Sequence, residues 1–557
     1  MSSKLKIYVV NLSRYVDVNG GETLLEVYDR LRDQIPGKAP ICARVNNKNE
    51  SLHYPVFNPK RVEYLTVDSP SGSRVYIRSL CMMLYKAVTD CYPGTRLRIE
   101  HSVSRGWYCT LNTAEPLDDT VVARLTERMY QLVDLDIPFE RKERLTADVV
   151  NIFRRQGLDD KVRLLSTTHE LYATYYRLDD VCDSYYGCLA PSTGSLATFD
   201  LRPYENGFLL LGPDPADTTH PSTPIAQRKM FHAFTEHVKF NQIIGVSNVG
   251  ELNEAVAKDK TAMIINVAEA LHDKNISRIA ADITDRYNRG GARVILIAGP
   301  SSSGKTTTTK RLAIHLMTNL LVPQMISLDD YFIDRELTPR DESGDYDFES
   351  LYALDLAAFN NDLNRLIAGE EVELPYYNFE KGRREYRGNR IRLGNRSILL
   401  IEGIHGLNPE LTAHVAEDMK YRVYVSALTT LSIDDHNWVP TTDNRLLRRI
   451  IRDHKYRGMS ATDTLRRWDS VRRGEERWIF PYQENADAMF NSSLIFELGV
   501  LRRRGEEILS GVPRDIPEYA EAYRLHRFLS YFTPIDERHV PSTSLLREFL
   551  GGSSFHY

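Results

Sequence analysis

Residues 299–306 read GPSSSGKT, which fits the Walker A pattern of a phosphate-binding loop. A short apolar run at residues 294–298 precedes this loop, and a stretch of helical character at residues 307–320 follows it. The small residues allow backbone N–H groups to close around phosphates at a helix N-terminus, where the helix dipole also favours negative charge. A glycine–serine turn before an ordinary helix is the alternative, but the strand–loop–helix setting favours a nucleoside-triphosphate site.

Two side chains of the loop carry the expected chemistry. Lys305 would place a full positive charge on the β and γ phosphates, and the Thr306 hydroxyl would ligate Mg²⁺. ATP and Mg²⁺ are therefore the expected cofactors. The other residues expected to bind ATP at this loop are Gly299, Ser301, Ser302, Ser303, Gly304 and Thr307.

Further apolar runs surround the loop in sequence. They lie at residues 294–298, 324–327, 398–401, 421–425 and 494–496, and amphipathic stretches separate them. One such stretch, residues 356–367, keeps helical spacing and stops at Gly369, a candidate helix C-cap. Buried strands that alternate with helices favour an α/β fold with a parallel sheet covered on both faces.

Acidic residues end two of these expected strands. Asp329 and Asp330 follow the strand that ends at residue 327, and Glu402 follows the run at 398–401. Open α/β sheets bind ligands at this carboxyl edge. Each acid alone could simply cap a helix, but three strands that bring phosphate-binding or acidic residues to one edge favour a catalytic site.

Residues 443–453 form an arginine-rich helix with an apolar stripe. The stripe would pack on the sheet and turn Arg445, Arg449 and Arg452 outward, where guanidinium groups bind phosphoryl oxygens bidentately. A solvated basic face is the alternative. Gly458 then offers a flexible turn suited to a lid.

The composition of the chain is that of a globular protein. Its 557 residues predict three or four domains, 26% are charged and 42% are hydrophobic, and these values exclude disorder over most of the chain. The net charge of −5 gives no basic excess that would demand nucleic acid as a partner, although a local basic patch stays possible.

No window has the run of apolar residues needed to span a bilayer, and the apolar start breaks at Asn11, before a signal-peptide core could form. We therefore expect a cytoplasmic protein with no membrane partner. The six cysteines lie between Cys42 and Cys188 with irregular spacing, which favours buried free thiols over a disulfide framework or a zinc site.

Taken in order from about Arg293 to Phe496, these motifs resemble the uridine kinase and phosphoribulokinase family of P-loop kinases. The resemblance implies that Asp329 is the catalytic base for a sugar hydroxyl and that Glu402 is an acid near Mg²⁺. It also implies that the phosphate contacts of the lid region are Arg449, Arg452 and Arg457. With Lys305, Arg449 and Arg452 would stabilise the transferred phosphoryl group.

The acceptor side follows from the same resemblance. Asp347 would hold ribose hydroxyls, and Tyr377, in a segment similar to the family's base-side hairpin, would lie against the nucleobase. Uridine–cytidine kinases carry a histidine shortly after that tyrosine, and Gly382 stands at this position here. Residues 432–442 resemble an insertion ahead of the lid.

The N-terminal half resembles other families. Residues 1–62 look like a TGS domain, a small ubiquitin-like α+β module, and residues 63–212 look like the α+β second additional domain of threonyl-tRNA synthetase. The editing-site positions of that domain read Arg78, Met82, Cys182 and Leu189 here. Since only the cysteine is kept, neither zinc binding nor aminoacyl-tRNA editing is expected.

The expected organisation is therefore five segments. They are 1–62 and 63–212 as above, a linker and helical connection at 213–288, a P-loop kinase domain at 289–512, and a C-terminal helical extension at 513–557 without evident chemistry.

The leading functional hypothesis is an ATP-dependent nucleoside kinase that phosphorylates the 5′-hydroxyl of uridine or cytidine. A second is a kinase of another small hydroxyl acceptor, such as a sugar phosphate, which the glycine at 382 favours. A third is an RNA- or ribosome-associated regulator, which the TGS resemblance motivates. The sequence leaves the oligomeric state open.

Overall fold

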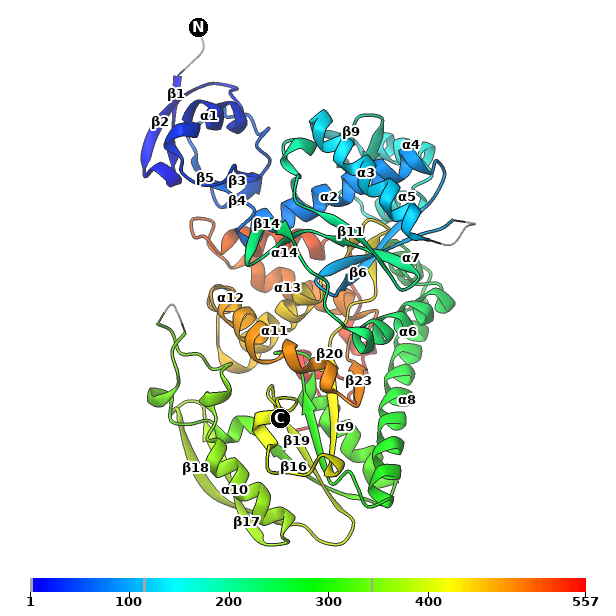
Figure 1. The fold of residues 1–557 in the computed structure, drawn as a ribbon, viewed down its shortest axis with the longest axis vertical. Coiled ribbons are helices and arrows are strands. Elements are labelled where there is room, and N and C mark those ends of the chain that lie inside the picture. The colour runs from blue at the N-terminus through cyan, green and yellow to red at the C-terminus, as the bar shows by residue number, and fades with distance from the viewer. Residues whose placement is uncertain (1–3, 114–116, 342–343, 557) are drawn as a thin grey trace.

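The structure of the chain is a computed structural model that describes residues 4–113, 117–341 and 344–556 (Figure 1). The outer ends of the expected domains, at residues 1 and 557, lie outside these ranges, and the expected domain limits stay predictions. Among the described helices, none combines the length and the apolar character that crossing a membrane requires.

The N-terminal unit is a five-stranded mixed sheet packed against one helix. Its elements are β1 (Lys4–Val9), β2 (Arg14–Asn19), α1 (Leu24–Leu31), β3 (Cys42–Val45), β4 (Lys48–Glu50) and β5 (Arg61–Leu65), with the strand order β2-β1-β5-β3-β4. Thr23 and Glu26 form a capping box that starts α1. Leu24, Val27 and Leu31 recur at helical spacing and are buried against the sheet.

The second unit surrounds one long buried helix, α2 (Pro70–Cys91). Around it lie α3 (Asp119–Leu135), α4 (Thr146–Arg155), α5 (Asp159–Thr167), and two sheets, β11-β12-β7-β6 and β10-β9-β8. These strands are β6 (Leu97–Val103), β7 (Gly106–Leu111), β8 (Glu140–Leu145), β9 (Tyr172–Leu178), β10 (Val181–Asp183), β11 (Asp200–Tyr204) and β12 (Gly207–Leu211). All six cysteines of the chain lie in these two units as free thiols, and Cys91 and Cys182 are partly exposed.

The proline-rich segment after β12 forms a short hairpin, β13 (Pro213–Asp214) with β14 (Asp217–Pro221), and three helices follow. These are α6 (Arg228–Ile244), α7 (Val249–Ala257) and α8 (Thr261–Asn288). The chain turns between α7 and α8 at Asp259, where φ is 57°. Beyond this turn, α8 packs along the parallel sheet of the C-terminal half (Figure 1).

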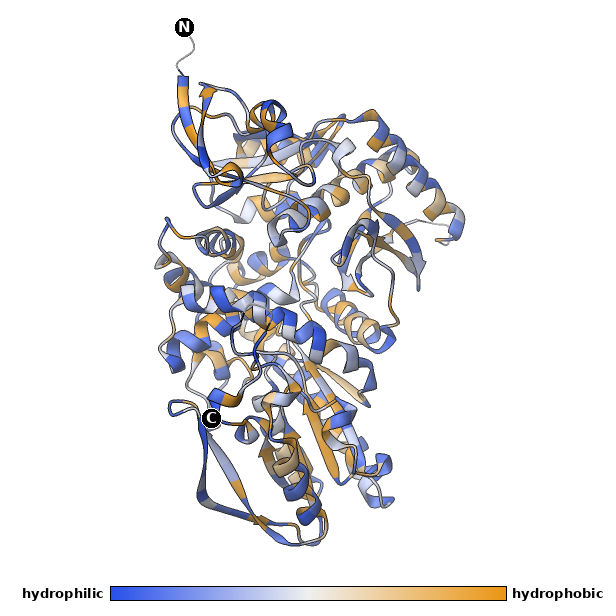
Figure 2. Cartoon of the chain, turned by 60° about the vertical axis from the view of Figure 1, so that its left-hand side comes forward, coloured by the Kyte–Doolittle hydropathy of each residue, from blue (hydrophilic) through white to orange (hydrophobic). Residues whose placement is uncertain are grey.

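The C-terminal half contains a parallel sheet in the order β16-β19-β15-β20-β23. Its strands are β15 (Val294–Ala298), β16 (Val322–Ser327), β19 (Ser397–Glu402), β20 (Lys420–Ser426) and β23 (Ala488–Asn491). Alternate residues of β15 enter different hydrophobic clusters, Ile295 on one face and Leu296 on the other. The expected parallel sheet with both faces covered is thus confirmed, and its apolar strands lie between helices in Figure 2.

One expected strand is wrong. Residues 494–496 form no strand; the fifth strand is β23, and the apolar run lies in the turn before α13 (Glu497–Ser510). Both Leu494 and Phe496 are buried in the hydrophobic core, which explains why this run is apolar although it is not a strand. The predicted helix at 356–367 is confirmed as α10 (Leu356–Ile367), and the hairpin β17 (Glu371–Asn378) and β18 (Arg383–Arg392) follows it.

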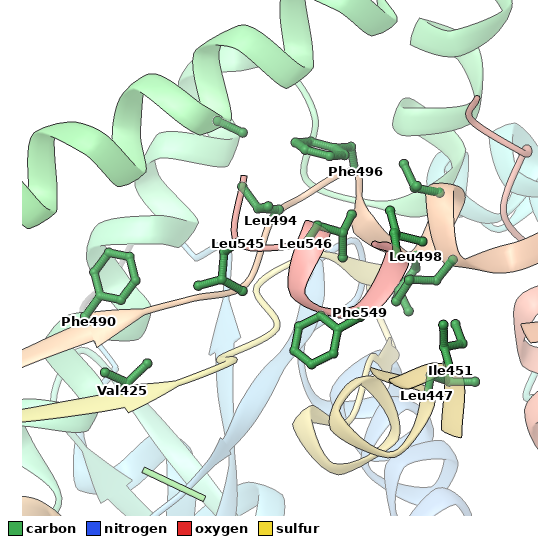
Figure 3. Packing of buried hydrophobic residues seen from close by; sticks show 14 of the residues in the cluster. Val425, Leu447, Ile451, Phe490, Leu494, Phe496, Leu498, Leu545, Leu546 and Phe549 are labelled. Atoms are coloured by element: carbon green, nitrogen blue, oxygen red, sulfur yellow. The ribbon is translucent and has the colours of Figure 1, made fainter. Parts of the chain in front are cut away.

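The expected C-terminal extension is not peripheral. It contains α14 (Tyr519–Leu529) and α15 (Arg547–Leu550), and Leu545, Leu546 and Phe549 are fully buried in the same core as Leu447 (Figure 3). Leu447 belongs to α11 (Thr441–Arg457), which continues through a turn into α12 (Ala461–Trp478).

The two halves are joined by a buried ion cluster. The insertion before α11 forms the hairpin β21 (Ser432–Asp434) and β22 (Asn437–Trp438). Lys161 of α5 lies 2.7 Å from Asp183 and 2.8 Å from Asp434, and His436 lies 2.7 Å from Asp183. All four side chains are almost fully buried. The hairpin therefore connects the C-terminal half to the N-terminal half.

Replacing Lys161 tests how much this buried ion cluster contributes to the stability of the protein. In Lys161→Met two buried carboxylates lose their shared cation, so the free energy of unfolding should fall by about 3–5 kcal/mol. Urea denaturation measures this change in the free energy of unfolding. The control Lys258→Met removes an exposed pair with Glu254 and should change stability by no more than about 0.5 kcal/mol. A loss below about 1 kcal/mol at Lys161 would contradict the assignment.

Candidate functional site

The phosphate-binding loop connects β15 to α9 (Lys305–Thr318), and its backbone needs both glycines. A Cβ atom on Gly299 would lie 2.0 Å from the Val425 carbonyl oxygen. Gly304 has a φ of +83°, in the left-handed region that glycine favours. The expected strand–loop–helix setting of the Walker A motif is confirmed.

Two buried arginines of α11 donate hydrogen bonds to backbone carbonyls of the loop. Arg445 Nε donates to the Ser301 carbonyl at 3.0 Å, and Arg448 Nη1 donates to the Ser302 carbonyl at 3.4 Å. Both side chains are at most 1% exposed. The expectation that Arg445 points outward is wrong, because the helix packs against the loop as well as the sheet. Sequence reasoning missed Arg448 altogether.

Two buried glutamates neutralise these arginines. Glu475 of α12 pairs with Arg445, and Glu497 of α13 pairs with Arg448. Glu475 also accepts a hydrogen bond from the Ser301 backbone N–H at 3.1 Å. No local sequence pattern identifies either glutamate, because both belong to helices that are far from the loop along the chain.

The outer arginines of α11 lie nearer the surface. Arg449 Nη1 donates to the Ser301 hydroxyl at 2.9 Å. Arg449, Arg452 and Arg457 all pair with the buried carboxylate of Asp453, at 3.3, 3.0 and 3.4 Å. The expected lid arginines are therefore brought together, with only Arg449 bonded to the loop.

The acids at the sheet edge meet the loop. Glu402 ends β19, and its Oε1 accepts a hydrogen bond from the Thr306 hydroxyl at 3.0 Å. Burial raises the pKa of Glu402 to about 7, and the nearby charge of Asp329 also raises it, while Lys305 lowers it. The Lys305 ammonium donates to the Pro300 carbonyl at 3.2 Å. Thr306, Glu402, Lys305 and Asp329 thus share one site.

Glu349 is a member of this site that sequence reasoning missed. Burial raises its pKa to about 7, and the charges that act on it include those of Arg449, Lys305 and Asp329. Beside it, Asp347 accepts a hydrogen bond from the Glu349 backbone N–H at 3.2 Å. This contact places Asp347 at the rim of the acidic site.

Asp329 and Asp330 are neighbours in sequence, but they interact with different parts of the structure. Both lie in the 3-10 helix η4 (Leu328–Tyr331). Asp330 Oδ1 accepts a hydrogen bond from the Tyr377 backbone N–H at 3.1 Å and so anchors the hairpin β17–β18. The charge of Asp329 acts instead on Glu402 and Glu349 beside the loop.

Tyr377 belongs to a cluster of aromatic rings. It is 3% exposed, and its ring centroid lies 5.6 Å from that of Phe332 and 5.1 Å from that of Phe379. The ring planes are inclined by 58° and 74°, so the three rings pack inclined to one another as an aromatic cluster next to Asp330.

The geometry at Gly382 accounts for the absence of a histidine there. Its φ is +67°, and a Cβ atom would lie 2.9 Å from Arg335 Cβ. The Gly382 carbonyl also accepts a hydrogen bond from the Arg335 backbone N–H at 2.8 Å. The turn of the hairpin β17–β18 therefore needs glycine at this position.

The C-terminal segment also reaches the loop. Glu548 Oε2 accepts hydrogen bonds from the Thr307 hydroxyl at 2.6 Å and from the Thr307 backbone N–H at 3.3 Å. The side chain of Leu545 lies against Gly304. No local sequence pattern indicates either contact.

The hydroxyl of Thr306 and the carboxylate of Glu402 suit Mg²⁺, which prefers oxygen ligands and binds through one or two carboxylates together with phosphates. Among the described residues, no group of three or more His, Cys, Asp or Glu side chains gathers as a closed metal site. An open site of this kind fits a metal that is shared with a nucleotide.

Comparison with known proteins agrees with this geometry. Residues 294–494 match the sequence profile of the Phosphoribulokinase / Uridine kinase family. This region is a domain of that family. The C-terminal half is therefore a P-loop kinase, and the family implies phosphoryl transfer from ATP, typically with Mg²⁺, to an alcohol group.

Two solved structures are similar to part of this chain. A putative fructose transport system kinase from Silicibacter sp. TM1040 is 18% identical, with a TM-score of 0.30, and the match covers 38% of this chain and 98% of that one. A possible uridine kinase from Bacillus stearothermophilus is 20% identical, with a TM-score of 0.25 and the same two coverages, 38% and 98%.

The N-terminal region matches threonine–tRNA ligases. The enzyme of Rubrobacter xylanophilus is 28% identical over 187 residues, which are 34% of this chain and 29% of that protein. The enzyme of Desulforamulus reducens is 29% identical over 182 residues, 32% of this chain and 28% of that protein. The chain thus spans less than a third of these relatives. The TGS assignment of residues 1–62 stays a prediction.

The constraint at Gly382 can be tested against a second glycine of the same hairpin. Gly388 has a φ of +79° with no atom near its would-be Cβ, so Gly388→Ala should cost only the backbone strain of about 1–2 kcal/mol. Gly382→Ala meets Arg335 as well and should cost about 1–3 kcal/mol more. Thermal and urea unfolding of both variants measure the difference, and equal losses would refute the steric constraint.

Proposed function

We propose that the protein transfers the γ-phosphoryl group of ATP to the 5′-hydroxyl of a nucleoside, with uridine or cytidine as the acceptor. The observation that carries this proposal is that the charge of Asp329 acts on Glu402 at the phosphate loop, while its neighbour Asp330 accepts a hydrogen bond from Tyr377 of the aromatic cluster. A carboxylate, a phosphate-binding loop and an aromatic cluster are thus supplied by neighbouring residues.

Each side chain has a role in this proposal. Asp329 accepts the proton of the attacking hydroxyl, Asp347 binds the ribose hydroxyls and Tyr377 lies against the base. Lys305, Arg449 and Arg452 stabilise the charge on the transferred phosphoryl group, and Arg457 contacts the ATP phosphates. Thr306 and Glu402 are the residues that would hold Mg²⁺, which would supply positive charge next to the phosphates. Closure of the lid excludes water from the transfer.

A kinase of another small hydroxyl acceptor is the second candidate. The turn at Gly382 supports it, because a buried polar group that reads the base edge can discriminate by orders of magnitude, and no side chain projects from this position. An assay of ATP consumption with nucleosides, sugar phosphates and pantothenate as acceptors separates the two candidates. Turnover with a sugar phosphate and none with nucleosides would reject the first.

Replacing Asp329 tests the mechanism on the acceptor found in that assay. Asp329→Asn should lower kcat by about 10²–10⁴-fold, because the hydroxyl loses its general base, while ATP binding stays intact. Asp418→Asn, an exposed aspartate before β20 at the opposite edge of the sheet, is the matched control and should keep wild-type kcat. Near-normal kcat in Asp329→Asn would show that another group is the base.

A further inference from the structure

A cavity of about 580 Å³ lies between the N-terminal half and α14, apart from the phosphate loop. Its walls come from β4, α2, β9, the turn after β10, the hairpin β21–β22 and α14, so parts of both halves enclose it. Its volume is in the range of small-molecule binding sites. Nothing in the kinase reaction uses this cavity.

The cavity contains a buried arginine without a carboxylate partner. Arg78 of α2 is 9% exposed, its Nη2 donates to the Cys188 carbonyl at 3.1 Å, and its Nε has no hydrogen-bond acceptor. Among the residues that the structure describes, no carboxylate forms an ion pair with it. A desolvated guanidinium in this state attracts an anion strongly.

The other arginines of the cavity wall are already neutralised. Each of them pairs with an acid at 3.4 Å or less: Arg74 with Glu521, Arg141 with Glu143, Arg524 with Asp443 and Arg527 with Glu170. Arg78 is therefore the cation of the cavity wall that remains available to a ligand.

A carboxylate on the same wall is also unpaired. Glu50 of β4 forms no ion pair within the described parts of the chain, and burial raises the pKa of its carboxyl group. Next to it, Asn49 Oδ1 is buried without a donor. The charges of Arg78 and Glu50 both act on the thiol of Cys188, yet the two side chains do not meet in an ion pair.

Opposite charges that flank one cavity without contact fit a ligand that carries both charges itself. We propose that this cavity binds a small zwitterion of the α-amino-acid class, with its carboxylate on Arg78 and its ammonium group on Glu50 and Asn49. The rest of the cavity leaves room for the ligand's side chain. Because Asn437 of β22 lines the same cavity, the bound ligand touches the hairpin that leads into α11.

Thermal unfolding and calorimetric titration of the full chain with free amino acids test this proposal. At least one should raise Tm and bind in the calorimeter, since a ligand that binds only the folded state stabilises it by mass action. The amide of that amino acid lacks the carboxylate and its N-acetyl derivative lacks the ammonium group, so both should bind at least about 10-fold more weakly.

Variants locate the site. Arg78→Met and Glu50→Gln should each weaken binding about 10-fold or more, while Arg289→Met, an exposed residue after α8, should not. The comparison of free amino acids with their derivatives uses the wild-type protein, so it holds even if Arg78→Met fails to fold. Binding of none of the free amino acids, equal binding of the amide, or unchanged affinity in Arg78→Met would overturn the proposal.

A second inference rests on the contact between Glu548 and Thr307. In a Walker A loop the backbone N–H groups at the start of the helix bind phosphate oxygens, and here the Thr307 N–H and hydroxyl bind a carboxylate instead. Leu546 and Phe549 anchor this segment in the core beside α11 (Figure 3). The Lys455 and Arg504 side chains also donate to the Leu550 carbonyl.

A carboxylate and a phosphate cannot share one set of donors, because both are anions. We infer that Glu548 acts as an internal phosphate mimic and that its side chain must leave the Thr307 donors before ATP can bind, which makes this contact autoinhibitory. This inference rests on the kinase assignment of the domain and not on the identity of the acceptor.

Calorimetric titration of ATP with Mg²⁺ into the full chain tests it without any acceptor. Glu548→Ala should bind ATP at least about 10-fold more tightly than the wild type, and Glu548→Gln, which keeps an acceptor oxygen without the charge, should be intermediate. Glu507→Ala, an exposed glutamate on α13, should bind like the wild type. Equal or weaker ATP binding by Glu548→Ala would overturn autoinhibition, whatever the acceptor assay shows.

Discussion

The phosphate loop depends on two guanidinium groups buried beneath it. Arg445 and Arg448 hold its carbonyls, and Glu475 and Glu497 neutralise them from two further helices. A buried ion pair is stable only when both partners and their hydrogen bonds are in place. The loop, α11, α12 and α13 therefore form one cooperative unit, and the lid that begins in α11 cannot shift at its base without disturbing the loop.

Much of the kinase half could be predicted from local patterns. The apolar runs identified four of the five strands of the sheet. Three of them, β15, β19 and β20, are buried along almost their whole length, and a strand buried on both faces is apolar throughout. The fourth, the edge strand β16, is only partly buried. The acids after two of those strands were found because parallel strands end at one edge. Glu402 and Asp329 accordingly lie beside the loop residues that the motif itself identified.

What could not be predicted depends on contacts between distant parts of the chain. Glu475 is 174 residues from its loop partner Ser301, and Glu548 is 241 residues from Thr307. A periodic pattern shows which face of a helix is apolar, but not that an arginine on another face will be enclosed by a neighbouring helix. For this reason the helical pattern does not predict the buried position of Arg445. The run that ends at Phe496 resembles a strand because its residues are buried in the core and therefore apolar.

The hairpin β21–β22 has a consequence for the modularity of the chain. It places Asp434 and His436 of the kinase half in a cluster completed by Lys161 and Asp183 of the N-terminal half. If the kinase half were separated from the N-terminal half, Asp434 and His436 would be exposed without their partners Lys161 and Asp183. Each half therefore supplies counter-charges that the other needs, and a division of the chain at this boundary would lower the stability of both parts.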